Sequence, residues 1–502
     1  MPATLDTLPP ELLNGILEII NEDDEQGNTR LGTLRALCRT SRYIKDTATP
    51  HLYQRLRLHR PGEEVLLLAR SLSENSSLAK HVQHGVFKAN LCKPIKPPHE
   101  EVFQAVSSTL IPIDTCKQMG RFKISMECGC HVLPVVRVLS LATQLRFLEL
   151  QLGGAMERRW PDVGETHSSA ESAPCLSLAY WLTRIFANAV NREQYKRLVN
   201  VRFSGNGVHG IHAAIGMMTI PSLQVMRLKG FGCTTPLSLT AGIAVSNVTS
   251  LYLYDCFFLA EGITSMIRSC KTLKELRVEY NVEVTGLADW VPSPEINVGM
   301  LMGGLQEHSK TLESLCLTDY WGSDELFGSS VPNFSLFTAL RYLEVDISLL
   351  FGDQTWAFAA LQLPPNVTEL VIHTDAKLED AQGTCECLSR VSHEHLKTVS
   401  LTFPVEEDFN EEWKDVEFIG KLCEALDPPE SLTRRTWEYG MRPVNRNGLV
   451  SVVLWWGGED VLAVIRAWTG GIQEYGVSEL LQRAMSGDKL CLRTKTDQST
   501  WT

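Results

Sequence analysis

The sequence predicts an α/β fold, a curved solenoid in which short parallel strands alternate with helices. Nine copies of one apolar phrase, Leu-x-x-Leu-x-Leu or a close variant, occur along the 502-residue chain. From the second copy to the fifth the spacing is 25 residues each time. A fixed period of this size is typical of a repeat protein, because each unit leaves an apolar face that only its neighbours can cover. The copies begin at Leu145, Leu198, Leu223, Val248, Leu273, Leu312, Leu340, Val367 and Leu396.

Each copy ends in residues of alternating polarity, which predict a short strand with one buried face. Leu276 and Val278, separated by Arg277, are an example. Between the copies, apolar residues at helical spacing predict helices over 260–273 and 300–312. One strand and one helix in each unit give parallel strands joined by crossover helices. Such units form either an open solenoid or a closed barrel of eight units.

The residue in the middle of each strand distinguishes these two architectures. Strands of an eight-unit barrel are buried on both faces and are almost continuously apolar. Here a polar residue separates the two apolar ones, and only an open surface would solvate it. The sequence therefore favours a solenoid with its parallel strands on the concave face, resembling the degenerate leucine-rich repeats of many fungal proteins. The middle residues include Arg202, Arg227, Tyr252, Arg277, Glu344 and Ser400.

The composition limits the compartment and the partners. A net charge of −12 disfavours general attraction to nucleic acids. No apolar run approaches the roughly 20 residues that span a bilayer, and the N-terminus lacks the basic and apolar regions of a secretion signal. We therefore expect a cytoplasmic or nuclear protein that binds neither membrane nor nucleic acid.

The sequence predicts no metal site, no cofactor and no catalytic motif. The two closest cysteine pairs, Cys128 with Cys130 and Cys385 with Cys387, lack the two-residue gap and the matching second pair of a zinc site. The chain contains no phosphate-binding glycine loop, nucleophile elbow or His-Glu-x-x-His motif. Residues gathered from separate repeats would leave no local motif, so an enzyme built on the array stays an alternative.

The first 60 residues follow a different pattern. A segment from Thr7 to Ile20 has prolines in the first turn of a predicted helix, and apolar residues at helical spacing continue to Tyr53. Three short helices in about 50 residues form a core that is marginal on its own, so this module is expected to need a partner or the rest of the chain. The apolar residues of the first helix, which we expect to form one face, are Leu12, Leu13, Ile16, Leu17 and Ile20.

Two short motifs in this module resemble the F-box family. The first has the form Leu-Pro-x-Glu-Leu-x-x-x-Ile-Leu. The second has the form Leu-x-x-Leu-x-x-Val followed by Cys or Ser, with a basic and an aromatic residue after it. Tyr43 stands where the family usually has Trp. The matching residues are Leu8, Pro9, Glu11, Leu12, Ile16 and Leu17, followed by Leu34, Leu37, Cys38, Ser41, Arg42 and Tyr43.

The resemblance implies that the module docks a Skp-type adaptor and, through it, the cullin scaffold of a cullin-RING ubiquitin ligase. For four of its apolar residues, Leu13, Leu17, Leu34 and Ile44, packing inside the helical core is the better interpretation. The adaptor-binding residues that the resemblance implies are Leu8, Pro9, Ile16, Leu37, Cys38 and Leu52.

We expect four parts in the chain. Residues 1–60 form the helical module, and 61–144 contain linking helices and an irregular first repeat that starts near His81 with a strand at 82–87. Residues 145–404 form the repeat array, which an insertion at 155–175 interrupts. Residues 405–502 hold an acidic insertion at 405–415 and a capping unit, with a strand predicted at 449–456 and a helix at 460–468.

Basic and aromatic residues gather at the strand positions of the earlier repeats, and acidic residues gather in the later ones. We expect the first group to recognise an acidic or phosphorylated segment of a target protein, because Arg offers paired donors and Tyr offers rigid contact area. The alternative is an ordinary hydrated surface. The predicted patch consists of Arg202, Arg227, Lys229, Tyr252, Tyr254 and Arg277.

These expectations together describe a non-catalytic substrate receptor of an SCF-type ubiquitin ligase. The helices would dock the adaptor, and the array would hold a target whose identity the sequence does not give. One alternative is a repeat scaffold without a ligase role. The other is the enzyme already mentioned.

Overall fold

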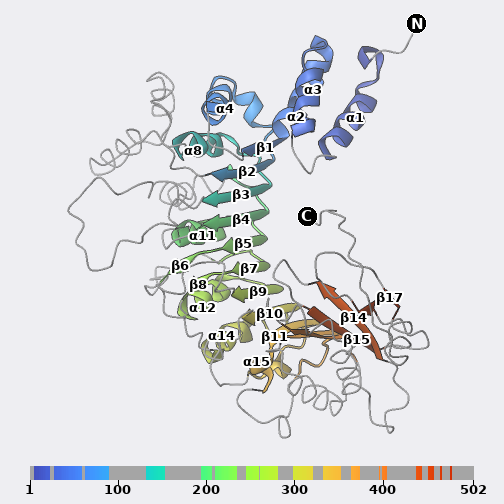
Figure 1. Cartoon of the computed structure of the whole chain (residues 1–502). Helices are drawn as coiled ribbons and strands as arrows, with labels where there is room; N and C mark the ends of the chain where they lie inside the picture. Colours follow the sequence, from blue (N-terminus) through green and yellow to red (C-terminus); the bar gives the residue numbers. More distant parts are fainter. Residues whose placement is uncertain are drawn as a thin grey trace, which may run out of the picture. The chain divides into compact units, whose positions relative to one another are not determined.

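The structure is a computed structural model, and Figure 1 shows its elements in chain order. The structure describes residues 5–22, 28–58, 63–89, 132–152, 194–205, 210–233, 245–258, 260–280, 298–319, 332–351, 363–373, 395, 398–403, 437–443, 450–456, 464–465 and 475–476. The two predicted insertions at 155–175 and 405–415 and the four paired cysteines lie outside these residues.

The chain divides into two compact units. The first comprises Met1–Leu251 and Ser269–Lys271, and the second comprises Tyr252–Arg268 and Thr272–Thr502. The boundary falls within one strand, β7 (Ser250–Tyr254).

The first unit begins with three helices that share a small apolar core. Proline occupies the first position of α1, where its missing N–H costs no helical hydrogen bond. Ser41 caps α3, because its side chain accepts a hydrogen bond from the backbone N–H of Ile44 at 3.2 Å. The core residues are Leu13, Leu17, Leu34, Ile44 and Ala48, which confirms the packing expected for the first four. The elements are η1 (Leu5–Thr7), α1 (Pro10–Glu22), α2 (Asn28–Leu37) and α3 (Arg42–Gln54).

A buried arginine ties these helices together. The Nε of Arg30 donates to the Oδ1 of Asn21 at 2.5 Å, and its Nη2 donates to the backbone oxygen of His51 at 3.2 Å. The amide of Asn21 in turn donates to Gln54 at 2.6 Å. Because Arg30 and Asn21 are both buried, these bonds replace the water that the polar groups lose.

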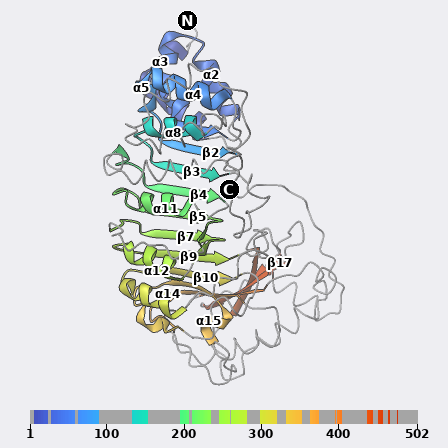
Figure 2. The same ribbon diagram turned by 90° about the vertical axis from the view of Figure 1, so that its left-hand side faces the viewer.

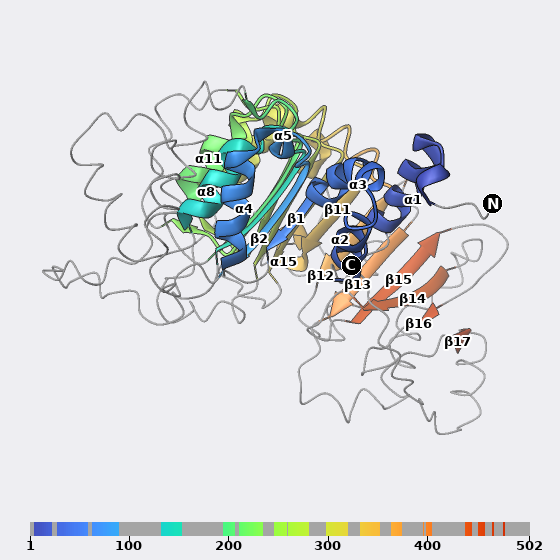
Figure 3. The same ribbon diagram turned by 90° about the horizontal axis from the view of Figure 1, so that it is seen from above.

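Five parallel strands form the sheet of the first unit, in the order β1-β2-β3-β4-β5. The helices α4, α8 and α11 lie along one side of these strands (Figures 1 and 3). The strands are β1 (Arg55–Leu58), β2 (His84–Ala89), β3 (Phe147–Leu152), β4 (Asn200–Gly205) and β5 (Val225–Lys229), followed by the short β6 (Gly232–Cys233). The helices are α4 (Glu63–Glu74), α5 (Ser76–Ala79), α8 (Val132–Leu141) and α11 (Gly210–Met218).

The second unit also has a parallel sheet, but its last strands pair antiparallel. Its parallel strands run in the order β9-β10-β11-β12-β13, and β15 then pairs antiparallel with β13. The strands are β8 (Phe257–Phe258), β9 (Glu275–Tyr280), β10 (Ser314–Asp319), β11 (Tyr342–Asp346), β12 (Glu369–His373), β13 (Thr398–Phe403), β14 (Trp437–Pro443), β15 (Val450–Trp456), β16 (Val464–Ile465) and β17 (Tyr475–Gly476). The helices are α12 (Ala260–Ser269), α14 (Val298–Leu305), η3 (Gln306–His308), η4 (Phe334–Leu336) and α15 (Ile347–Phe351).

The parallel sheet is open, so the closed barrel is excluded. In neither unit does the strand order return to its first strand. Figure 2 shows strands β2, β3, β4 and β5 of the first unit stacked in sequence order. The chain is therefore a mixed α/β protein with an open parallel sheet, as the polar middle residues of the strands predicted.

Two sequence expectations need correction. The sheet begins at β1, not near His81, because Arg55 to Leu58 pair in register with the strand predicted at 82–87, which is β2. Their basic and apolar residues alternate, but no turn residue separates them from the end of α3. In the tail, the strand predicted at 449–456 is present as β15. The helix predicted at 460–468 is wrong for the described residues, since Val464 and Ile465 pair with neighbouring strands, where β-branched side chains fit well.

The alternation along β5 gives a direct test of which face is the core. Leu228→Ala should lower the free energy of unfolding by about 2–5 kcal/mol, because Leu228 is fully buried and its loss leaves a cavity. The neighbouring exposed residue is the control, and Lys229→Ala should change it by less than about 0.5 kcal/mol. Urea unfolding followed by circular dichroism measures both. Equal losses in the two variants would contradict the assigned face.

Candidate interaction surfaces

Helix α1 carries an apolar row that its own unit does not bury. Leu12 is 58% exposed, Ile16 39% and Ile19 65%. Spacings of four and three residues place these three side chains on one side of a helix. Leu13 and Leu17, one position further along, are buried in the core. The single apolar face predicted for this helix is therefore two faces, one filled and one exposed.

The six predicted adaptor-binding residues fall into two groups. Pro9 and Ile16 are exposed and Leu8 is partly exposed; Leu8 and Pro9 precede α1, and Ile16 lies in the middle of it. The backbone oxygen of Leu8 accepts a hydrogen bond from the hydroxyl of Tyr43 at 3.1 Å, which joins the two motifs. The other three, Leu37, Cys38 and Leu52, pack partly buried against the helical core.

Sequence reasoning missed one member of the exposed row, Ile19, and placed Leu12 on the same face as Leu13. The spacing of the apolar residues along α1 is enough to separate the two rows. At 3.6 residues per turn, residues 12, 16 and 19 share one side of a helix, and residues 13, 17 and 20 share the next. Which of the two sides meets the core depends on where α2 and α3 pack, and the pattern within α1 alone does not specify that.

Three residues of the predicted recognition patch lie in the first unit, next to side chains of neighbouring strands. Arg202 is opposite Arg227 in the β4–β5 pair, and Ser204 is opposite Lys229. The guanidinium of Arg202 lies 5.3 Å from the centre of the Phe147 ring, and its Nη1 is 3.9 Å from a carboxylate oxygen of Glu149. The Nη1 of Arg227 donates to the side-chain oxygen of Asn200 at 3.3 Å.

The other three patch residues lie at the boundary strand and in the second unit. The rings of Tyr252 and Tyr254 stack at 6.3 Å with an angle of 8° between their planes. The hydroxyl of Tyr252 donates to the carboxylate of Glu275. Arg277 pairs with Glu279, and its Nη2 lies 3.1 Å from a carboxylate oxygen of Glu344. The charge of Arg277 is therefore engaged by carboxylates of its own sheet.

Glu344 is the centre of a buried polar cluster in the second unit. One of its oxygens accepts the Tyr342 hydroxyl at 2.8 Å and also meets Arg277, and the other lies 3.0 Å from the Nε2 of His373. Burial alone would raise the pKa of this carboxyl. The hydrogen bond with His373 and the charge of Arg277 outweigh burial and lower the pKa to about 2. Glu344 is therefore a carboxylate at neutral pH.

The sheet residues around Glu344 are also buried, which corrects the expectation of a hydrated face in the later repeats. Glu344 is 2% exposed, and Cys316, which pairs with it in register, is equally buried. Thr318, Asp346 and His373 are buried as well. The exposed face expected from the polar middle residues is found in the first unit, at Arg202 and Lys229. Position in the repeat predicted the row of polar residues but not their burial.

The buried cluster is suited to holding charge and not to nucleophilic chemistry. Burial and the nearby Glu344 carboxylate raise the pKa of the Cys316 thiol well above its ordinary value, and the same two causes raise the pKa of Tyr342. Both groups therefore stay protonated at neutral pH. Among the described residues, no group of three or more His, Cys, Asp and Glu side chains is arranged to hold a metal ion.

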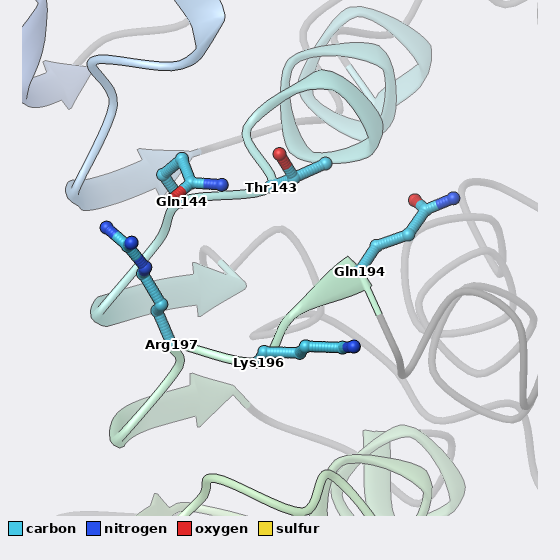
Figure 4. A pocket seen from close by; sticks show the side chains of 5 residues that line it. All are labelled: Thr143, Gln144, Gln194, Lys196 and Arg197. Carbon is cyan, nitrogen blue, oxygen red and sulfur yellow. The ribbon is translucent and has the colours of Figure 1, made fainter.

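A depression lies on the described part of the first unit. Thr143 and Gln144 precede β3, and the remaining residues precede β4 (Figure 4). Its lining side chains are polar or basic and include no carboxylate, histidine or cysteine, so it offers neither a metal site nor a catalytic acid and base. The lining residues are Thr143, Gln144, Gln194, Lys196 and Arg197.

No protein-family model matches the chain, and the search of curated proteins gave no match. Within the part of the chain that the structure describes, every helix is too short or too polar to cross a bilayer. The functional interpretation therefore depends on the residues themselves.

The Glu344 cluster predicts a specific pH dependence of stability. Because the folded-state pKa is about 2 and lies below the ordinary value of 4.5, the stabilising contribution of Glu344 is complete above about pH 4.5 and is lost as the pH falls toward 2. Glu344→Gln should lower the free energy of unfolding by about 3 kcal/mol at pH 7, because it removes the buried carboxylate that Arg277 and His373 contact, while Arg277 keeps its pair with Glu279. The difference from the natural chain should shrink as the pH falls from 4.5.

Urea unfolding between pH 7 and pH 3 measures this difference. Glu369→Gln is the control, because Glu369 lies on the neighbouring strand β12 and is only partly buried. It should differ from the natural chain by less than about 0.5 kcal/mol at each pH. A Glu344→Gln defect of the same size at every pH would contradict the assigned role of the carboxylate.

Proposed function

We propose that this protein is the substrate-recognition subunit of an SCF-type cullin-RING ubiquitin ligase. One observation carries the proposal. A three-helix module with F-box-like motifs exposes an apolar row on its first helix, at Leu12, Ile16 and Ile19. Apolar side chains gathered on one face of a small module are typical of a surface that a partner covers.

The motif positions support the adaptor as that partner. Leu8 and Pro9 precede α1, and Ile16 belongs to the exposed row. Leu37, Cys38 and Leu52 are partly buried against the core, so in this proposal they shape the module and contribute their exposed edges to the contact. Burying the row against a Skp-type adaptor would remove apolar area from water, which favours association.

The rest of the chain suits the second task of a receptor, which is to bind the target. Its repeated strands present long rows of side chains on rigid elements, and such rows suit the recognition of a protein segment. The chain itself then carries out no chemistry. Its contribution is proximity, because a tethered target meets the ligase at a raised effective concentration. The finer fold assignment, an F-box module followed by a leucine-rich-repeat-like solenoid, belongs to the same proposal.

Adaptor capture tests the proposal. The full chain should co-purify with a Skp-type adaptor, and the double variant Leu12→Asp and Ile16→Asp should reduce capture at least tenfold, because each charge would be buried without a partner in the interface. Leu67→Asp is a matched control, since Leu67 on α4 and Leu12 are both 58% exposed. It should capture the adaptor as the natural chain does.

Circular dichroism and the unfolding midpoint establish that all three proteins are folded. Failure of the folded natural chain to bind the adaptor would overturn the ligase role. Equal loss in the Leu67→Asp control would overturn the assignment of the surface to α1. If the adaptor binds but no bound protein depends on the proteasome for its abundance, the scaffold alternative replaces the receptor.

A further inference from the structure

The residues just before α1 make few backbone bonds of their own. The carbonyl of Pro9 accepts a hydrogen bond from the N–H of Leu13 at 3.1 Å, so Pro9 already takes part in the first turn of the helix. Leu8 lies one residue outside that turn. Its N–H donates to the carbonyl of Leu5 at 3.3 Å, at the end of η1. A single 3-10 turn gains little from cooperativity, so its conformation depends on contacts with other elements.

A side chain of α3 supplies such a contact. The hydroxyl of Tyr43 donates to the carbonyl of Leu8 at 3.1 Å. Tyr43 is the second residue of α3 and lies between the helix cap at Ser41 and the buried Ile44, so its backbone is fixed. A tyrosine side chain has only two χ angles. The phenol of Tyr43 is therefore a stiff link between α3 and the segment that precedes α1.

Leu8 continues the spacing of the exposed row on α1 but does not belong to the helix. It lies four residues before Leu12, just as Leu12 lies four residues before Ile16. Within a helix this spacing places side chains on one side. Because Leu8 precedes Pro10, the first helical residue, helical geometry does not fix the place of its side chain. The bond from Tyr43 provides the constraint that the helix lacks.

Exposed apolar side chains are concentrated in this part of the chain. Ten large apolar residues are exposed among those that the structure describes, and five of them lie between residues 5 and 43. Because the hydroxyl of Tyr43 is bonded to Leu8, a partner that covers the row on α1 and continues past its start would also meet Leu8 and the Tyr43 ring. The five exposed residues are Leu5, Leu12, Ile16, Ile19 and Tyr43.

We propose that Tyr43 is a positioning residue for the adaptor contact. Its hydroxyl holds the carbonyl of Leu8 and so places the Leu8 side chain as the first member of the apolar row that the adaptor covers. Since the segment is held before docking, association orders little additional chain and loses less conformational entropy. The inference rests on the proposed function in one respect, that the partner covering this surface is a Skp-type adaptor.

Direct contact between the Tyr43 hydroxyl and the adaptor is the alternative role. A tyrosine hydroxyl has a single proton to donate, and here Leu8 accepts it. Donation to the adaptor would have to break this bond, whereas the positioning role leaves it in place. The two roles also differ in a measurable respect, because positioning acts through the Leu8 side chain and direct contact does not.

Removal of the hydroxyl alone tests the inference. Tyr43→Phe should weaken binding of the full chain to a Skp-type adaptor about fivefold, because docking must then order a segment that is held beforehand in the natural chain. Biolayer interferometry measures the affinity. Tyr53→Phe is the matched control, since Tyr53 lies on the same helix and its hydroxyl makes no hydrogen bond to the described residues. It should bind as the natural chain does.

A double-mutant cycle with Leu8→Ala separates positioning from direct contact. In the Leu8→Ala background the effect of Tyr43→Phe should fall below about twofold, because the side chain to be positioned is gone. A loss of the same size in both backgrounds would show that the hydroxyl acts independently of Leu8 and would overturn the inference. Unchanged affinity of Tyr43→Phe, or an equal loss in Tyr53→Phe, would overturn it as well. Circular dichroism establishes that every variant is folded.

Amide hydrogen exchange of the free chain gives a readout that does not need the adaptor. The N–H of Leu8 should exchange faster in Tyr43→Phe than in the natural chain, while the amides of α3 keep their rates. An unchanged rate at Leu8 would overturn the placement of Leu8 by Tyr43. If the folded natural chain does not bind the adaptor, the ligase role fails, and the exchange rate still decides whether Tyr43 holds Leu8. If the adaptor binds the natural chain and Tyr43→Phe equally, only the inference fails.

Discussion

The in-register stacking of apolar residues between parallel strands is the constraint on which the other features of this protein depend. In the second unit Leu276, Leu315, Leu343 and Leu370 are successive partners across four strands, and all are buried. In the first unit Leu150, Phe203 and Leu228 do the same. Because side chains of a strand alternate between its faces, fixing this ladder also fixes the row of residues on the opposite face. A shift by one residue would exchange the two rows, at the cost of the whole apolar ladder.

The two units share this local strand pattern but differ in the row of residues on the face opposite the apolar ladder. In the first unit it holds cations with one carboxylate among them, and the side chains keep contact with water. In the second unit one Arg and one His face Glu344, and ion pairs and hydrogen bonds replace the water around the carboxylate. Charge complementarity between its strands thus gives the second unit a buried cluster that stabilises the fold.

The helical module at the N-terminus also has both a buried group and an exposed group of side chains. Three helices of at most 13 residues enclose a core of five buried side chains, and the apolar content of α1 exceeds what this core accommodates. The surplus is exposed at Leu12, Ile16 and Ile19. The buried bonds of Arg30 hold the helices in place, so the exposed row is presented on a fixed backbone. A partner that covers the row would gain buried apolar area with little ordering of the chain.

The sequence by itself determined the α/β class, the repeat period, most of the parallel strands and the open sheet, because alternation and period are local properties that one unit displays alone. It also identified Leu13, Leu17, Leu34 and Ile44 as core residues and placed Arg202, Arg277 and Glu344 at equivalent strand positions. Only the tertiary structure decided that β1 begins the sheet at Arg55, that Val464 and Ile465 are strand, and that Glu344 is buried while Arg202 is exposed. These outcomes depend on which side chains from distant repeats become neighbours. Burial and strand pairing depend on these neighbours, so the sequence of a single repeat does not determine them.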